Sequence, residues 1–396
     1  MKKHHLLPRR STPLVLASSL LLAATTQAAV VTYDIPGGQT VEVDTPIEGD
    51  NEVLKLGEGT LILSAANTYT GDTSILGGTA TLTGGGASIV SDYGSVVVAD
   101  ATFNILNGAL LQVYAIDVMQ NDTLGGQMNV VGSNVSVLDY VSVGDVGAGR
   151  LSMSEGASLQ AYNLYAGYAA GSQGEITVSG TGTTLSTDSY ASIGEGGNGL
   201  LRIENGASVE FGDTLWVGYY TGASGTVQVV GGTLTVNNNA RFGDDGYGTG
   251  IISDGASVRV EGDVILGDNE NAIGQLIVSG SSTLWANGDL TVAEDGKGLL
   301  RIEDGSHVHV GAHLTVGYQS TASGTLVVTG GSLSVSGYIE LGYEGHATGT
   351  ISGGAVVSGA YDLYLGSAEG GSGQLTVTGT NTTVLANDLW VGADGR

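Results

Sequence analysis

The sequence contains no cysteine and few residues of several other types. Its 396 residues include four prolines, three phenylalanines and only 12 lysines and arginines. Without cysteine there are no disulfide bonds and no thiolate metal sites, so packing and hydrogen bonding must hold the fold together. Glycine, by contrast, supplies 68 residues, and charged residues make up only 13% of the chain. Such a composition is atypical of a helical globule and favours short strands joined by glycine-rich turns.

Four of the 12 basic residues lie within the first ten positions, at Lys2, Lys3, Arg9 and Arg10. An apolar run from Leu14 to Ala24 follows, and small residues precede a cleavage point after Ala28, so we expect residues 1–28 to be an export signal. This run is too short to span a membrane comfortably. Without the signal, 8 basic residues (12 − 4) face 39 acidic ones, a formal charge of −31. That charge argues against a nucleic-acid partner.

A phrase of the form Leu-x-Val-Gly recurs through the last two-thirds of the chain. The residue before the glycine falls at positions 143, 166, 193, 217, 242, 266, 292, 316, 341, 365 and 391, in steps of about 25 residues. Alternate copies match best, because the sequence of residues 199–206 returns almost unchanged at 298–305. The true unit is therefore about 50 residues long and consists of two similar halves.

Within each half the apolar residues alternate, as at Leu201 and Ile203 or Leu215 and Val217. Period two indicates strands with one buried face. Three short strands fill one half-repeat, which we interpret as one coil of a parallel β-helix with coils about 4.8 Å apart. A β-propeller is the alternative, since its blades repeat at about 40–50 residues. The strong half-repeat, the very short strands and the absence of a Trp-Asp phrase favour the β-helix.

Residues 53–85 carry a different repeat, in which Asn67-Thr68-Tyr69-Thr70-Gly71 is followed by a Gly-Gly turn. This segment resembles the autotransporter-associated β-strand repeat. Residues 141–396 resemble repeats shared by type V secretion passengers and sorted (PEP-CTERM) bacterial surface proteins. We therefore divide the chain into the signal (1–28), N-terminal coils (29–140) and regular repeats (141–396).

The resemblance implies a right-handed parallel β-helix exported through the inner membrane of a Gram-negative bacterium to its outer membrane and cell surface, or secreted. It also implies a C-terminal outer-membrane β-barrel, which this sequence does not contain. Because the sequence stops at Arg396 within a repeat, we interpret it as a fragment or a truncated gene product.

Two groups of residues are candidates for metal binding. Acidic residues follow the Val-Gly phrase in alternate coils and could bind Ca²⁺ weakly through carboxylates and turn carbonyls, although Asp-Gly and Glu-Gly also make good solvated corners. His307, His309 and His313 cluster, whereas His346 stands alone in a turn, and solvated strand histidines are the favoured interpretation. The acidic residues are Asp145, Glu195, Asp244, Asp245, Glu294, Asp295, Glu344 and Asp394.

Tyr168, Tyr219 and Tyr318 occupy matching positions in the other coils and suggest either a contact stripe for sugar or protein, or structural stacking. Arg202 and Arg301 sit at equivalent repeat positions with no catalytic partner in the pattern. We therefore predict no catalytic, cofactor-binding or metal residue, and no enzymatic activity.

The expected function is a surface passenger in adhesion or cell–cell aggregation, contacting a host-surface or bacterial-surface protein or glycan. The alternatives are a stalk that presents a domain encoded beyond Arg396 and a polysaccharide-active β-helix enzyme.

Overall fold

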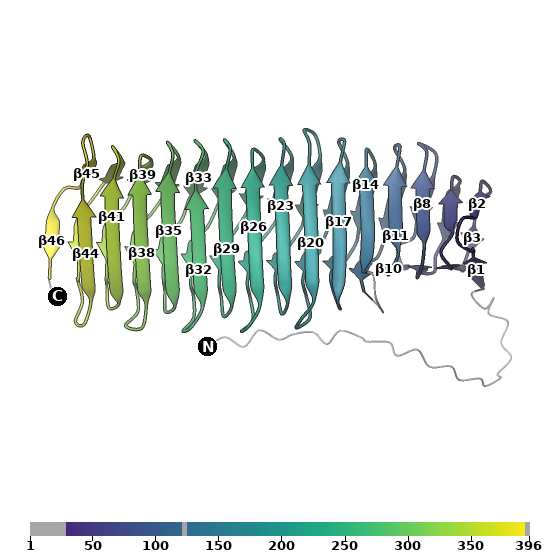
Figure 1. The fold of residues 1–396 in the computed structure, drawn as a ribbon, viewed down its shortest axis with the longest axis horizontal. Coiled ribbons are helices and arrows are strands. Elements are labelled where there is room, and N and C mark those ends of the chain that lie inside the picture. The colour runs from purple at the N-terminus through teal and green to yellow at the C-terminus, as the bar shows by residue number, and fades with distance from the viewer. Residues whose placement is uncertain (1–28, 121–124, 393–396) are drawn as a thin grey trace.

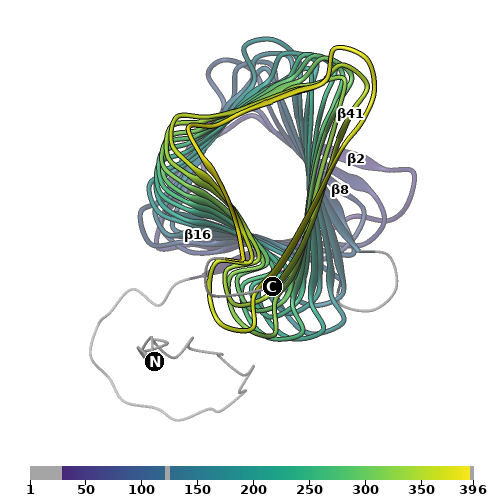
Figure 2. The ribbon, with the colours of Figure 1, turned by 90° about the vertical axis from the view of Figure 1, so that its left-hand side faces the viewer.

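The computed structural model describes residues 29–120 and 125–392, which form one long β-solenoid (Figure 1). All strands in this part of the chain belong to three parallel sheets. Successive strands visit sheets 1, 2 and 3 in turn, so three strands complete one coil, and the coils stack into a three-sided cross-section (Figure 2). The predicted all-β parallel β-helix is confirmed, and the propeller is excluded. The described residues contain no helix of the length and apolarity needed to cross a membrane.

The strands divide among the sheets as follows. Sheet 1 consists of β1 (Val30–Asp34), β4 (Glu52–Leu56), β7 (Thr73–Ile75), β10 (Val96–Ala99), β13 (Ile116–Met119), β16 (Tyr140–Val143), β19 (Asn163–Ala166), β22 (Ala191–Ile193), β25 (Leu215–Val217), β28 (Ala240–Phe242), β31 (Val264–Leu266), β34 (Leu290–Val292), β37 (Leu314–Val316), β40 (Ile339–Leu341), β43 (Leu363–Leu365) and β46 (Leu389–Val391). Sheet 2 consists of β2 (Thr40–Val43), β5 (Thr60–Leu63), β8 (Thr79–Thr83), β11 (Thr102–Leu106), β14 (Gly126–Val131), β17 (Ala148–Ser154), β20 (Gln173–Ser179), β23 (Asn198–Glu204), β26 (Ser224–Val230), β29 (Tyr247–Ser253), β32 (Ile273–Val278), β35 (Lys297–Glu303), β38 (Ser323–Thr329), β41 (His346–Ser352) and β44 (Ser372–Val377). Sheet 3 consists of β3 (Glu48–Gly49), β6 (Ala66–Tyr69), β9 (Ser88–Val90), β12 (Leu110–Val113), β15 (Asn134–Val137), β18 (Ser158–Ala161), β21 (Thr184–Thr187), β24 (Ser208–Phe211), β27 (Thr233–Val236), β30 (Ser257–Val260), β33 (Thr283–Ala286), β36 (His307–Val310), β39 (Ser332–Val335), β42 (Val356–Gly359) and β45 (Thr383–Leu385).

Coil length alternates, which gives the double repeat its structural basis. Tyr247 pairs with Ser224, 23 residues earlier, and with Ile273, 26 residues later. Most of the difference lies in the corner between sheets 1 and 2. That corner has six residues between β25 and β26 but four between β28 and β29. The predicted 50-residue unit is thus a pair of coils that differ in one corner.

The core lies inside the coils and follows the predicted alternation. In β23, Gly199, Leu201 and Ile203 point inward and are buried, while the residues between them are more exposed. Each fully buried aliphatic side chain contributes roughly 1.5–3 kcal/mol. Because every coil pairs with the next through parallel hydrogen bonds, burial and backbone bonding are both shared between neighbouring coils.

The first residue of the corner between sheets 1 and 2 has a left-handed backbone conformation. From Gly144 to Gly392 its φ lies between 63° and 77° in every coil. A Cβ at Gly218 would lie 2.1 Å from the carbonyl oxygen of Tyr247 in the next coil, so glycine is required there. Ala293, with φ of 68°, is the one residue other than glycine at this position in these coils.

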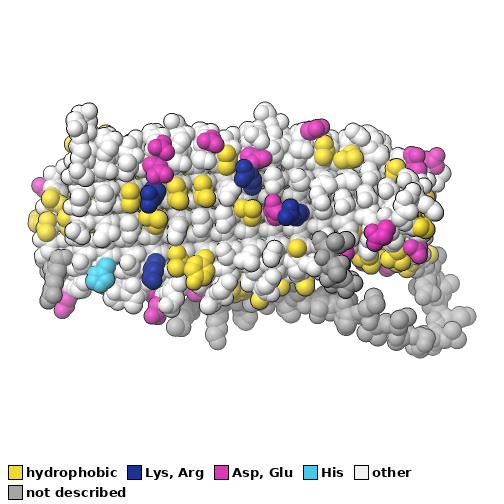
Figure 3. Space-filling model, in the orientation of Figure 1, with side chains coloured by type: hydrophobic (Ala, Val, Ile, Leu, Met, Phe, Trp, Pro, Cys, Tyr) yellow, Lys and Arg dark blue, Asp and Glu magenta, His cyan; other side chains and the backbone are white. Residues whose placement is uncertain are grey.

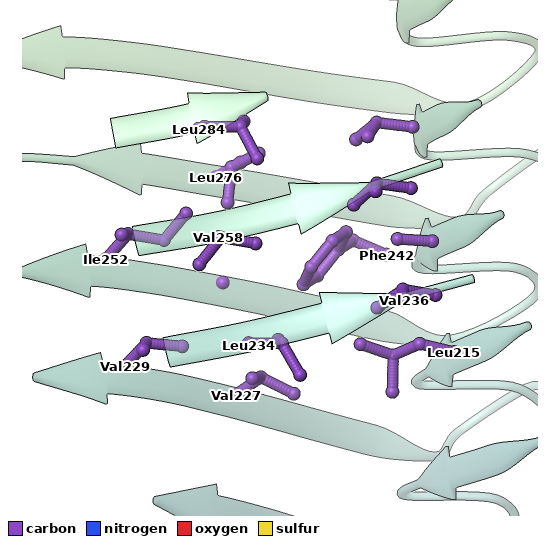
Figure 4. A pocket seen from close by; sticks show the side chains of 14 residues that line it. Leu215, Val227, Val229, Leu234, Val236, Phe242, Ile252, Val258, Leu276 and Leu284 are labelled. Atoms are coloured by element: carbon purple, nitrogen blue, oxygen red, sulfur yellow. The ribbon is translucent and has the colours of Figure 1, made fainter. Parts of the chain in front are cut away.

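Core packing is looser where glycine takes an inward position, at Gly250 and Gly349. A cavity of about 20 Å³ lies in the core beside Phe242, at the coil where Gly250 replaces the usual inward aliphatic residue (Figure 4). A Cβ at Gly250 would approach the ring of Phe242 to 2.8 Å. The large ring therefore fills most of the space left by the missing side chain.

Candidate functional site

The N-terminal repeat contains a side chain that joins three successive coils. The Nδ2 group of Asn67, which is fully buried, donates to the carbonyl oxygens of Ala65 at 2.9 Å and Ser88 at 3.0 Å. Its Oδ1 accepts a hydrogen bond from the backbone N–H of Ile47 at 3.0 Å. An Asn at this position satisfies backbone groups that would otherwise be buried without partners.

The rest of the same phrase is also structural. Tyr69 is fully buried, and its hydroxyl bonds Thr73 Oγ1 at 2.6 Å inside the coil. Gly71 packs against the previous coil, where a Cβ would lie 2.5 Å from the carbonyl oxygen of Asn51. The buried residues of the motif that carries the family resemblance therefore fix coil stacking, and its exposed side chains are the threonines Thr68 and Thr70.

Lys55 is buried in the same region. Its ammonium group donates to the carbonyl oxygens of Leu56 (2.8 Å), Gly57 (2.7 Å) and Gly77 (3.0 Å). Burial lowers the pKa of Lys55, while the nearby carboxylates of Glu58 and Asp34 oppose that shift. The lysine ammonium group thus links the backbone carbonyl oxygens of two neighbouring corners near the N-terminal end of the solenoid.

The outer side of sheet 1 is covered by side chains rather than open. Ser142 and Ser192 point outward in register with Tyr165, yet they are 0% and 1% exposed. Tyr168 packs edge-on against Tyr165 with ring centroids 5.3 Å apart. The corner side chains thus fold over this sheet as a second, mixed polar and aromatic layer.

The other predicted tyrosines also contact aromatic rings. Tyr219 lies 4.8 Å from Trp216 in a T-shaped contact, and Tyr318 stacks on Tyr343 at 5.3 Å. Tyr318 remains 41% exposed at the surface. These contacts favour structural stacking for Tyr168 and Tyr219 and leave Tyr318 as a surface aromatic.

Three carboxyl groups meet in consecutive coils beside this layer. Asp244, Asp268 and Glu294 each follow the first residue of their corner, and backbone hydrogen bonds from Asp268 to Gly243 (2.9 Å) and from Glu294 to Gly267 (3.0 Å) align them. Asp268 lies in the middle and hydrogen-bonds with both of the others. We call these three residues the carboxyl cluster.

Arg241 lies beside the carboxyl cluster and supplies its positive charge. Its guanidinium group forms an ion pair with Asp268, whose side chain is only 12% exposed. The same guanidinium group lies 5.4 Å from the ring centroid of Trp216, a cation–π contact. An aromatic ring, an arginine and three carboxyl groups therefore lie together on one edge of the solenoid.

The carboxyl cluster holds protons at neutral pH. Burial is the main cause that raises the pKa of Asp244 to about 8, followed by its hydrogen bond and repulsion with Asp268. Burial also raises the pKa of Glu294 to about 7, and the charge of Asp268 adds to this shift. Arg241 opposes both shifts but is shared among three acids, so repulsion is relieved by protonation.

The predicted histidines are bonded to neighbouring side chains. His307 and His309 bond the hydroxyls of Ser332 (2.8 Å) and Ser334 (2.9 Å) in the next coil, on the outer side of sheet 3. Trp285 pairs with His309 in the sheet and lies 4.6 Å from its ring.

The other two histidines lie apart from that pair. His313 stacks on Tyr338 at 3.8 Å, and its Nδ1 accepts the backbone N–H of Tyr338 at 3.1 Å. His346 begins β41 and does not lie in the predicted turn.

No three of the histidine, aspartate and glutamate side chains in the described residues are arranged to hold a metal ion. Of the acidic row, Asp244 and Glu294 join the carboxyl cluster, whereas Asp145, Glu195 and Glu344 lie in other coils. Asp394 lies outside the described residues, as does the expected signal at 1–28.

Asp268 and Arg241 were missed by sequence reasoning. From Asp145 to Tyr318 the second corner residue alternates between acids and tyrosines, except that Asp268 stands where its equivalents are Tyr219 and Tyr318. This break in the alternation is the signal that could have revealed the cluster, because it removes the tyrosine that elsewhere separates two acids.

Comparison with known proteins gives one match. The family model described as Passenger-associated-transport-repeat matches residues 53–79. No curated protein and no solved structure matches the chain. The matched repeat and the solenoid together fit an autotransporter passenger with repeats, which confirms the resemblance carried by Asn67 and Gly71. A passenger-associated repeat in turn implies a secreted or surface-exposed chain.

Proposed function

We propose that this chain is a non-enzymatic autotransporter passenger that acts in adhesion or cell–cell aggregation at the bacterial surface. The observation that carries the proposal is the continuous surface of the solenoid: three sheets of 15 or 16 strands run through the described residues. Such a rod offers repeated side chains at about 4.8 Å spacing over a length of roughly 70 Å. An extended array suits many weak contacts with a surface protein or glycan.

Surface display tests this proposal. The chain is fused to an outer-membrane anchor on a non-adherent bacterium, and settling, biofilm mass and binding to host cells are compared with the anchor alone. Increased settling or attachment is expected. Unchanged values in all three assays, with display shown by surface labelling, would count against adhesion and aggregation.

Glycan cleavage is the second candidate function, and the carboxyl cluster favours it. Asp244, with its pKa of about 8, keeps a proton at neutral pH, and its neighbour Asp268 is paired with Arg241. Glycoside hydrolysis uses a protonated carboxyl group and a carboxylate about 5–10 Å apart, on either side of the scissile bond. Cleavage at this site therefore requires the hydrogen bond between Asp244 and Asp268 to open around the sugar. The stacked Trp216 could support a sugar ring.

A panel of polysaccharides incubated with the purified chain tests this second function. Release of reducing ends that is lost in Asp244→Asn and in Asp268→Asn, but kept in Glu344→Gln, would assign the activity to the cluster. No release from any polysaccharide removes this candidate.

A further inference from the structure

Charge is distributed unevenly over the solenoid. The strands of sheet 2 contain four basic and four acidic residues, so their net charge is zero. The rest of residues 29–396 carries 35 acidic (39 − 4) and four basic (8 − 4) residues. The charged residues of sheet 2 are Arg150, Arg202, Lys297, Arg301, Glu42, Glu175, Glu204 and Glu303.

We call the outer side of sheet 2 the neutral face. Two copies of a rod this acidic repel each other mainly through their corners, because the strands of sheets 1 and 3 carry net charges of only −2 (4 acidic, 2 basic) and −1 (2 acidic, 1 basic). What distinguishes the neutral face is its larger number of basic residues, four in all, which are matched by four glutamates and can meet opposite charges on a second copy.

The neutral face also has the chemistry of a contact surface. Ile251 and Ile277 are adjacent in register, point outward and are half-buried. Gln228 precedes them and Arg301 follows them in the same column. Figure 3 shows this side of the molecule, with hydrophobic side chains between groups of charged ones. An apolar centre with a polar rim is typical of protein interfaces.

The charged residues of this face form two matching rows. Arg202 pairs with Glu204 on β23, and Arg301 lies 3.8 Å from Glu303 on β35. In both rows the glutamate lies two residues after the arginine and points to the same side. The rows stand four strands apart in sheet 2, on either side of Ile251 and Ile277.

We propose that the neutral face binds the neutral face of a second copy of this chain, with the two rods side by side and parallel. A two-fold axis along the rods, between the arginine and glutamate columns, places Arg202 opposite the partner's Glu204 and Arg301 opposite the partner's Glu303. Each contact occurs twice because the interface is isologous. An antiparallel pair centred on β29 instead places Arg202 opposite the partner's Arg301, which like-charge repulsion disfavours.

The size of the face fits a stable pair. The ten strands β17 to β44 of sheet 2 have six or seven residues each, and they cover about 48 Å by about 20 Å at ordinary strand spacing. Pairing buries about 950 Å² on each copy, or about 1,900 Å² in total, within the range of specific protein–protein interfaces.

Sedimentation velocity of the purified chain tests the proposal, and a dimer is the expected species. The variant R202E/R301E raises the dimer Kd at least about tenfold, because four facing pairs become repulsive. The fourfold exchange R202E/E204R/R301E/E303R restores dimerisation, which a simple loss of folding cannot do. Arg259→Glu, on sheet 3, is the matched control and leaves the Kd unchanged.

Because the chain has no cysteine, a single introduced thiol reports the orientation. Val327→Cys lies on β38, so its partner thiol is close in a parallel pair and six coils away, about 29 Å, in the antiparallel pair. A short bismaleimide is expected to cross-link this variant. The proposal is overturned if the chain is a monomer at every soluble concentration or if R202E/R301E leaves the dimer Kd unchanged. It is also overturned if a dimer forms but Val327→Cys does not cross-link.

Discussion

Phe242 covers Gly250. A Cβ built on the glycine lies 2.8 Å from the phenylalanine ring and 2.6 Å from Cδ1 of Leu276. Phe242 and Gly250 both line the core cavity, and Figure 4 shows the phenylalanine ring beside it. In the preceding coil their register partners are Val217 and Val227, so one large and one absent side chain replace two medium ones.

This pair predicts non-additive effects on stability. Phe242→Ala lowers the free energy of unfolding by about 3–5 kcal/mol because it enlarges a cavity. Gly250→Val overpacks the same space and costs about 1–3 kcal/mol. The double variant F242V/G250V copies the preceding coil and is expected to be more stable than Phe242→Ala. Urea unfolding of the wild type, Phe242→Val, Gly250→Val and the double variant gives the coupling energy, and additive values would contradict the packing relationship.

Ala293 predicts a stabilising substitution. Its φ of 68° is the conformation that its equivalents adopt as glycine. Ala293→Gly removes the contact of Cβ with the backbone and is expected to raise the free energy of unfolding by about 1 kcal/mol. The reverse change at the equivalent position, Gly317→Ala, is the control and is expected to lower it. Thermal unfolding followed by circular dichroism provides the comparison, and a lower melting temperature for Ala293→Gly would refute the strain.

We predict that substitution of Lys55 lowers the free energy of unfolding substantially, although nothing in the sequence distinguishes this lysine. Lys55→Met removes the ammonium group that donates to three carbonyl oxygens, of which that of Leu56 keeps a backbone donor, the N–H of Ile35, and costs about 1–3 kcal/mol. Lys297→Met removes a lysine from the exposed start of β35 and is expected to change stability by less than about 0.5 kcal/mol. Equal urea midpoints for the two variants would show that the carbonyl bonds contribute nothing.

The carboxyl cluster predicts a pH dependence with a definite sign. Asp244 has an ordinary pKa of 3.8 and a folded pKa of about 8, so the folded state binds more protons between these values. The free energy of unfolding therefore falls as pH rises from about 4 to about 8. Glu294, whose pKa is raised to about 7, contributes in the same direction.

Asp244→Asn tests that dependence. The amide cannot ionise, so the variant is expected to lose less stability than the wild type between pH 5 and pH 8, and to be the more stable protein at pH 8. Glu344→Gln, outside the cluster, keeps the wild-type slope. A steeper slope in Asp244→Asn than in the wild type would mean that the cluster is stabilised in its charged form.

The fold was predictable because its signals are repeated many times. Alternating apolar residues and the glycine at each corner recur with every coil, so single exceptions such as Gly250 or Ala293 do not hide the pattern. The cluster of Asp244, Asp268 and Glu294 was not predictable in the same way. The cluster forms only because corners of unequal length align across neighbouring coils. A consensus of all the repeat copies also hides Asp268, the one corner where aspartate replaces tyrosine.

The role of Lys55 was hidden for a different reason. A lysine in an alternating strand is normally expected to face solvent. Its burial follows from three carbonyl oxygens that belong to two coils and converge at one corner. The carbonyl oxygens meet only because the backbones of neighbouring coils stack. The sequence pattern of polar and apolar residues does not indicate this.

The measurement that tests the account most directly is the settling rate of non-adherent bacteria that display this chain, normalised to the number of copies on each cell. We predict that settling and surface attachment increase with copy number, and that Glu344→Gln, in a corner of the solenoid, leaves this increase intact. If cells with abundant displayed chain settle and attach no faster than cells with the anchor alone, the proposed role in adhesion and aggregation is contradicted.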